Sequence, residues 1–114
     1  MYKLINGWTK AAVMEQIKKY NNGTQARDKK HTVCKYKTEN GNRCAIGCFI
    51  PDGHAALNHE GDVLSMLNVF PDLWDKMPFD VDGIGYFQSA HDKCFNDNQV
   101  YQSIEFFLDK EVEE

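Results

Sequence analysis

The stretch from Cys34 to Asp52, CKYKTENGNRCAIGCFIPD, constrains the fold of this chain more than any other. It contains three of the four cysteines. At Asn40-Gly41 it also has two residues that readily adopt positive φ, as tight hairpin turns require. The flanking β-branched and aromatic residues suit strands; they are Val33, Tyr36, Ile46, Phe49 and Ile50. The stretch therefore predicts a β-hairpin.

The length of the turn decides which side chains share a face of this hairpin. A two-residue turn at Asn40-Gly41 pairs residues whose numbers sum to 81. A turn with an odd number of residues pairs residues whose numbers have an even sum, and only this register gives one polar and one apolar face. We therefore expect an odd turn of three to five residues with a bulge at Gly41. The apolar face would then contain Cys34, Tyr36, Cys44, Ile46 and Cys48. A short helix over 44–50 is the alternative, because periodicity does not decide so short an apolar run.

Apolar residues recur at helical spacing elsewhere in the chain. Thr9, Asp62 and Asp82 are placed to cap helices at their N-termini. Pro71 either interrupts the second helix or begins another. The predicted helices cover residues 9–20, 63–70, 83–94 and 98–110.

These elements predict one α+β domain over residues 1–114. A small hairpin of two or three antiparallel strands would pack against four or five α-helices. The expected core contains Trp8, Val13, Ile17, Tyr36, Ile46, Phe49, Leu64, Leu67, Phe70, Trp74, Phe87, Ile104 and Phe107.

Hydropathy indicates a cytoplasmic protein. No apolar run approaches the roughly 18 residues that a membrane helix needs, and the N-terminus has neither the apolar core nor the cleavage site of a secretory signal. The cysteines are accordingly expected to be reduced thiols.

Charge is divided unevenly along the chain. Residues 1–50 carry ten Lys/Arg against three Asp/Glu, whereas residues 51–114 carry three against fourteen, so the balances are +7 and −11. Such asymmetry can mark a binding surface, although the halves can also neutralise each other in the fold. The acidic half could dock on a basic host surface. The basic residues nearest the hairpin could contact phosphates; they are Lys29, Lys30, Lys35, Lys37 and Arg43. A pI near 5.5 argues against general nucleic-acid binding.

The motif at 44–52, Cys-Ala-Ile-Gly-Cys-Phe-Ile-Pro-Asp, resembles one in a family of small uncharacterised phage and prophage proteins. The preceding Cys-x-Tyr at 34–36, Glu-Gly at 60–61 and Gln-x-x-His-Asp at 88–92 extend the resemblance over residues 34–92. The family often has Ala at the position of Cys48, which implies that this thiol is not essential. The resemblance implies a phage origin, and hence the cytoplasm of a host cell, but no activity.

Three thiols on one hairpin face raise the possibility of zinc. A fourth ligand could be His31, His54, His59, His91 or Cys94. The spacing C-x9-C-x3-C differs from the paired C-x2-C of zinc knuckles. We therefore expect Cys34, Cys44 and Cys48 to be buried thiols, with no cofactor.

A thiol enzyme is a further hypothesis. Cys44 would be the nucleophile, His91 the base and Asp92 or Asp52 the orienting carboxylate of a hydrolase or transferase. Against this, neighbouring side chains on a helix diverge by about 100°, so His91 and Asp92 are not expected to serve one site. His91 is then expected to be a core histidine that donates a hydrogen bond to backbone, with Asp92 at the surface.

The favoured function is therefore that of a non-enzymatic accessory protein that binds a host macromolecule, a protein rather than a nucleic acid, and modulates a host or defence process. The Cys44–His91 enzyme and a zinc-stabilised binding module are the alternatives.

Overall fold

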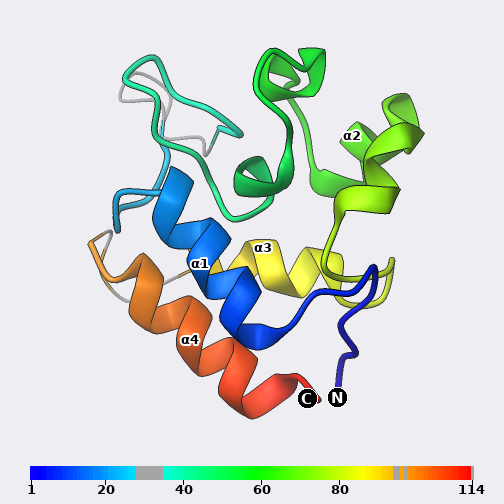
Figure 1. Ribbon diagram of the computed structural model, residues 1–114. Coiled ribbons are helices and arrows are strands. Elements are labelled where there is room, and N and C mark those ends of the chain that lie inside the picture. Colours follow the sequence, from blue (N-terminus) through cyan, green and yellow to red (C-terminus); the bar gives the residue numbers. More distant parts are fainter. Residues whose placement is uncertain (28–34, 94–95, 97, 114) are drawn as a thin grey trace.

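Helices account for the regular structure of the computed structural model, which describes residues 1–27, 35–93, 96 and 98–113. Figure 1 labels the α-helices, which are α1 (Lys10–Tyr20), α2 (Val63–Val69), α3 (Ile84–Asp92) and α4 (Val100–Glu111). Short 3-10 helices lie between α1 and α3: η1 (Ile46–Phe49), η2 (Ala55–Asn58) and η3 (Pro71–Lys76). The four predicted helices are present, and their ends fall within two residues of the expected positions.

The predicted α+β fold is wrong, because the central stretch does not form a hairpin. The bridges that join two described residues are isolated ones, antiparallel Lys37↔Arg43 and parallel Tyr2↔Val112. The turn itself does close, with the Thr38 N–H donating to the Asn42 carbonyl at 2.8 Å and Gly41 at φ +90°. Directly after this turn, however, the chain coils into η1. The described fold is therefore helical.

Burial on every side explains why the stretch coils. All residues from 42 to 50 are buried, so a strand here would need partners for its backbone groups in the core. A helical turn satisfies these groups within the segment, as the Cys48 N–H does by donating to the Cys44 carbonyl at 3.1 Å. The alternative prediction, a short helix over 44–50, is confirmed in part, because the chain forms a 3-10 helix over Ile46–Phe49.

Gly47 allows η1 to lie directly against the chain that leads into the turn. A Cβ at this position would overlap the Tyr36 carbonyl oxygen and approach the Cβ of Arg43 to 3.2 Å. The two backbone segments can therefore meet only because this residue has no side chain.

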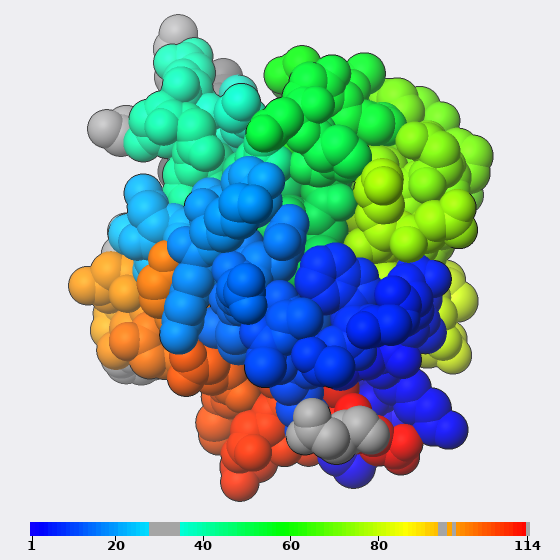
Figure 2. Space-filling model, in the orientation of Figure 1, coloured from blue at the N-terminus to red at the C-terminus, as the bar shows by residue number. Residues whose placement is uncertain are grey.

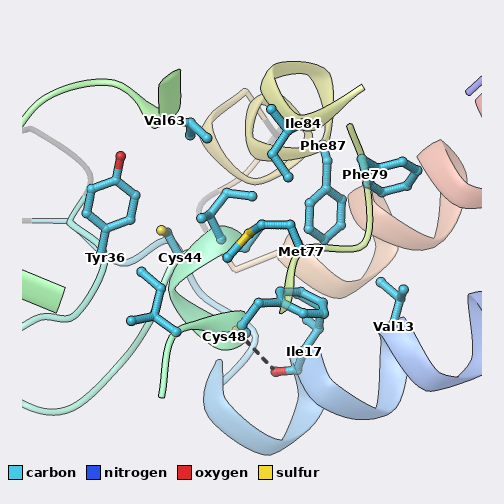
Figure 3. Packing of buried hydrophobic residues seen from close by; sticks show 14 of the residues in the cluster. Val13, Ile17, Tyr36, Cys44, Cys48, Val63, Met77, Phe79, Ile84 and Phe87 are labelled. Carbon is cyan, nitrogen blue, oxygen red and sulfur yellow. Dashed lines mark hydrogen bonds between the residues drawn. The ribbon is translucent and has the colours of Figure 1, made fainter. Parts of the chain in front are cut away.

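Aromatic rings fill the centre of the core, which Figure 3 shows in part. Phe87 on α3 is the middle of the cluster, with ring centroids 5.7 Å from Phe49, 5.2 Å from Phe79 and 6.3 Å from Phe107. These tilted and edge-on contacts are the geometries that aromatic pairs prefer. Phe87 therefore joins η1, α3 and α4.

Most of the predicted core residues are buried. Trp8, Phe70 and Trp74 are only half-buried but pack against the core. Leu64 is the exception, because it is 44% exposed. Its helical spacing predicted burial, but α2 turns this residue toward a cavity described below.

α3 and α4 pack side by side and antiparallel. The Ser103 hydroxyl donates to the Ala90 carbonyl at 2.5 Å, and one turn further along α4, Phe107 meets Phe87. The N-terminal segment pairs with the end of α4, so the two chain ends lie together in Figure 1. Figure 2 shows α1 and α4 as adjoining bands of one face. No helix in the described residues has the length and apolar character needed to cross a membrane.

Two of the three predicted caps are confirmed. The side chains of Thr9 and Asp62 accept backbone N–H bonds at 3.1 and 2.8 Å at the starts of α1 and α2. The prediction for Asp82 is wrong, because buried Gly83 occupies the cap position of α3. The Asp82 N–H instead donates to the Asp80 carboxylate at 3.0 Å, within the turn before the helix.

Replacing Gly47 should test the close approach of η1. We expect Gly47→Ala to lower the free energy of unfolding by about 3 kcal/mol or more, because the new methyl group overlaps rigid backbone. Gly85→Ala is the matched control, since nothing lies within 4 Å of a Cβ there. On α3 it should raise stability by about 0.5 kcal/mol. Chemical denaturation measures both, and equal effects would contradict the packing described.

Candidate functional site

A cavity of about 810 Å³ opens between α3, the start of α2 and the segment around Tyr36. Tyr36, Cys44, Val63 and Leu64 form its apolar wall. Figure 3 shows the first three of these at one edge of the core. Cavities of roughly 300–1,000 Å³ with apolar walls and a few polar groups are typical of small-ligand sites.

One face of α3 forms the polar wall of the cavity. Gly85, Gln88, Ser89 and Asp92 follow at intervals of three, one and three residues, so they share a helix face, and all four line the cavity. Sequence reasoning considered Asp92 but missed Gln88 and Ser89. Their spacing is visible in the sequence, but only the position of α2 turns this face into the wall of a cavity.

His91 has both imidazole nitrogens occupied. The side chain is fully buried. The Ala26 N–H, which can only donate, lies 2.9 Å from Nε2, so Nε2 accepts and the ring proton is on Nδ1. Nδ1 then donates to Asp92 Oδ1 at 2.7 Å. The side chains of His91 and Asp92 are therefore in contact, contrary to the prediction from the sequence. The neutral His91 ring has no free lone pair with which to take a proton from Cys44, because Nε2 already accepts the Ala26 N–H.

Gln88 connects α3 to η1 and helps to orient the Asp92 carboxylate. Its Oε1 accepts the Ile46 N–H at 3.0 Å, and its Nε2 donates to Asp92 Oδ1 at 3.2 Å. Asp92 Oδ1 thus receives bonds from fully buried His91 and from Gln88, which is only 9% exposed. The carboxylate is held from behind by buried groups, while 36% of its side chain remains exposed.

The two cysteines in the described ranges have different surroundings. Cys44 borders the cavity but is only 1% exposed, and its sulfur accepts the Gly47 N–H at 3.4 Å. Cys48 is fully buried, and its thiol donates to the Ile17 carbonyl at 3.9 Å. Burial raises the pKa of the Cys48 thiol well above its ordinary value, and the neighbouring Cys44 adds to this shift. Cys34 lies outside the described residues.

In the part of the chain that the structure describes, no three His, Cys, Asp or Glu side chains are grouped so as to hold a metal ion. His31 and Cys94 lie outside that part. His54 and His59 both present their rings edge-on to Phe70, with centroids 5.2 and 6.1 Å away. His54 Nε2 also lies 2.9 Å from an Asp72 carboxylate oxygen.

Arg43 is buried and bonded within the central stretch. Its guanidinium donates to the carbonyls of Gly47 at 3.3 Å and Ile50 at 2.8 Å, and it pairs with the Asp52 carboxylate. It also lies over the Tyr20 ring, 4.5 Å from the centroid. Contrary to the expectation from the sequence, Arg43 is therefore not part of an exposed basic surface.

The other predicted basic residues do not form one described surface. Lys35 lines the cavity and is half-buried, whereas Lys37 is exposed at the bridge beside the turn. Lys29 and Lys30 lie outside the described residues. The predicted phosphate-binding role stays a prediction for these lysines.

A second feature, which sequence reasoning missed, is an exposed aromatic surface on α3 and α4. We call Tyr2, Tyr86 and Phe106 the aromatic face. Tyr86 is 60% and Phe106 65% exposed, and the rings of Tyr2 and Tyr86 stack with centroids 5.3 Å apart. Tyr86 lies one turn before Ala90 on α3, and Phe106 lies one turn after Ser103 on α4. The Ser103 hydroxyl donates to the Ala90 carbonyl, so the two helices are in contact at this level. The aromatic side chains therefore lie along the same outer side of the helix pair.

Carboxylates surround the aromatic face. The pKa of the Tyr2 hydroxyl is raised by burial first, and then by the nearby Tyr86 hydroxyl and Glu111 carboxylate. Lys110 is the basic residue in the last turn of α4, and its ammonium lies 3.7 Å from a carboxylate of its neighbour. The exposed acidic residues around the face are Asp82, Glu105, Asp109 and Glu111, of which Glu105 pairs with Lys18 at 3.4 Å. Exposed Lys3 follows Tyr2 in the chain, so the acidic residues around the face outnumber the basic ones rather than exclude them.

Comparison of the chain with protein-family models, with curated proteins and with solved structures gives no match.

Truncating Arg43 should destabilise the fold. We expect Arg43→Met to lower the free energy of unfolding by about 2–4 kcal/mol, because it removes charge-assisted bonds to two buried carbonyls and the partner of Asp52. Lys37→Met makes the same change in charge at an exposed position and should alter stability by less than about 0.5 kcal/mol. Urea denaturation measures both variants. Similar values for the two would show that the Arg43 bonds contribute little.

The buried Cys48 thiol should make stability fall in alkaline solution. Its pKa is raised in the folded state, so the unfolded chain loses this proton first. The contribution to stability is therefore complete below the ordinary thiol pKa of about 8.5 and is lost as pH rises above it. At pH 9–10, Cys48→Ala should reduce the slope of unfolding free energy against pH by up to about 1.4 kcal/mol per pH unit. An unchanged slope would contradict this.

Proposed function

We propose that this chain is a non-enzymatic, phage-type accessory protein that binds a basic surface of a host protein through its aromatic face. The exposure of Tyr86 and Phe106 among carboxylates is the observation that carries the proposal. Because the motif at 44–52 resembles one in phage proteins, we expect the partner that carries this basic surface to be a protein of the host cytoplasm. Binding would modulate a host or defence process.

The chemistry of the aromatic face supports a protein partner. Tyr and Phe are enriched at protein interfaces, and residues that dominate binding energy are often large aromatics. Tyr86 is supported by stacking on Tyr2, so part of the entropy cost of ordering its ring is already met in the free protein. The acidic surroundings favour a partner rich in Lys and Arg and would steer it toward the face.

The state of His91 supports binding over the alternative enzymatic function. A Cys-His enzyme needs an imidazole that can accept the thiol proton. Here Nε2 accepts the Ala26 N–H and Nδ1 donates to Asp92, so catalysis would require breaking a buried hydrogen bond. The partners of His91 are those of a structural histidine.

Capture from a lysate of the bacterial host tests the proposal. The immobilised wild-type protein should retain a basic protein that dissociates as salt is raised, because screening weakens charge complementarity. The double variant Tyr86→Ala/Phe106→Ala should retain at least about tenfold less, as expected for loss of two interface aromatics. Both side chains are more than half exposed, so the variant should stay folded.

Val69→Ala is the matched control, because Val69 is 59% exposed on α2, away from the aromatic face. It should retain the same protein as the wild type. Equal retention by the double variant and the control would overturn the proposal. Sedimentation that shows a dimer in the wild type and a monomer in the double variant would also overturn it, by assigning the aromatic face to a second copy of this chain.

A further inference from the structure

The cavity between α2 and α3 is lined by charges of both signs. Glu60 and Asp62 stand on the side of α2, and Asp92 on α3. Arg27 and Lys93 stand on the side where α3 ends. Charges of opposite sign meet where α3 ends, because Asp92 and Lys93 are neighbours, and Lys35 adds a further cation to the lining. A ligand complementary to such a cavity carries charges of both signs on an apolar body.

Buried side chains hold the Asp92 carboxylate of this cavity in place. Its hydrogen bonds from described side chains, His91 and Gln88, both fall on Oδ1, so Oδ2 can accept a donor from a ligand. Buried partners that fix the orientation of a partly exposed carboxylate are a common support for a binding group. A carboxylate held in this way accepts N–H donors, and most strongly from an ammonium group.

The inner end of the cavity is acidic. The Tyr36 hydroxyl donates to the Gly61 carbonyl at 3.0 Å. Burial raises the pKa of this hydroxyl, and the neighbouring Cys44 and the carboxylates of Asp62 and Asp92 raise it further. The two carboxylates therefore lie near the same point, where an ammonium group would be favoured and an anion would not.

We propose that this cavity binds a small zwitterion, an amino acid or dipeptide with an apolar side chain, whose ammonium group bonds to Asp92. The carboxylate of the ligand faces Arg27 and Lys93, and its side chain lies against Val63 and Leu64. This role accounts for the exposure of Leu64, which a purely structural α2 would bury. The site is separate from the aromatic face, because Gln88 lines the cavity and Tyr86, two residues earlier on α3, points about 160° away from it.

Nuclear magnetic resonance titration of the 114-residue protein with L-phenylalanine tests the proposal. Resonances of Gln88 and Ser89 should shift, with a Kd of about 1 mM or lower. N-acetylphenylalanine, which has no ammonium group, should bind at least about tenfold more weakly, and phenylalaninamide, which has no carboxylate, severalfold more weakly. No shift of these resonances up to about 10 mM, or equal binding of the acetylated compound, would overturn the proposal.

Asp92→Asn supplies an independent test, because the amide oxygen can still accept the His91 bond while the negative charge is lost. Affinity for L-phenylalanine should fall at least about tenfold. Asp75→Asn makes the same change at an exposed carboxylate outside the cavity and should leave affinity unchanged. Equal affinities would overturn the assignment of Asp92. The comparison of amino-acid derivatives on the wild type decides the matter if Asp92→Asn does not fold.

Discussion

The buried guanidinium of Arg43 is the interaction on which the centre of this fold depends. It gathers the carbonyls of Gly47 and Ile50 and the carboxylate of Asp52, and it lies over Tyr20 of α1. The guanidinium is planar and has five donors in a fixed geometry, whereas lysine has three donors on a flexible side chain. Arg43 therefore bonds to backbone carbonyls that neighbouring strands would bond to in a sheet. Because these carbonyls have partners, η1 can end inside the core.

The position of η1 in turn decides the position of α3. The Ile46 N–H is accepted by Gln88, and Phe49 packs on Phe87, so α3 is tied to η1 by one polar and one aromatic contact. From there, α3 serves two different surfaces. The side with Gln88 lines the cavity, and the side with Tyr86 is part of the aromatic face. A single nine-residue helix thus connects the core to both surfaces for which binding is proposed.

The proposed roles follow from which polar groups are already satisfied. His91 and Gln88 have their bonds within the protein and act as supports, whereas Asp92 keeps one oxygen for a partner. The same reasoning removes Arg43 from the candidate binding residues, because its donors are used internally. A charged residue in the sequence is therefore a candidate for binding only if the fold leaves it with unused bonding capacity.

By itself, the sequence determined the helices, because apolar spacing and the caps Thr9 and Asp62 are local properties. It also located the turn near Gly41, which needs positive φ. It could not choose between strand and helix for 44–50, because that choice depends on whether Arg43 and the Tyr36 backbone meet the segment from outside it. Nor could it show the cavity or the contact of His91 with Ala26, residues 65 positions apart. Long-range packing decided these features, since burial and hydrogen-bond satisfaction are properties of the whole fold.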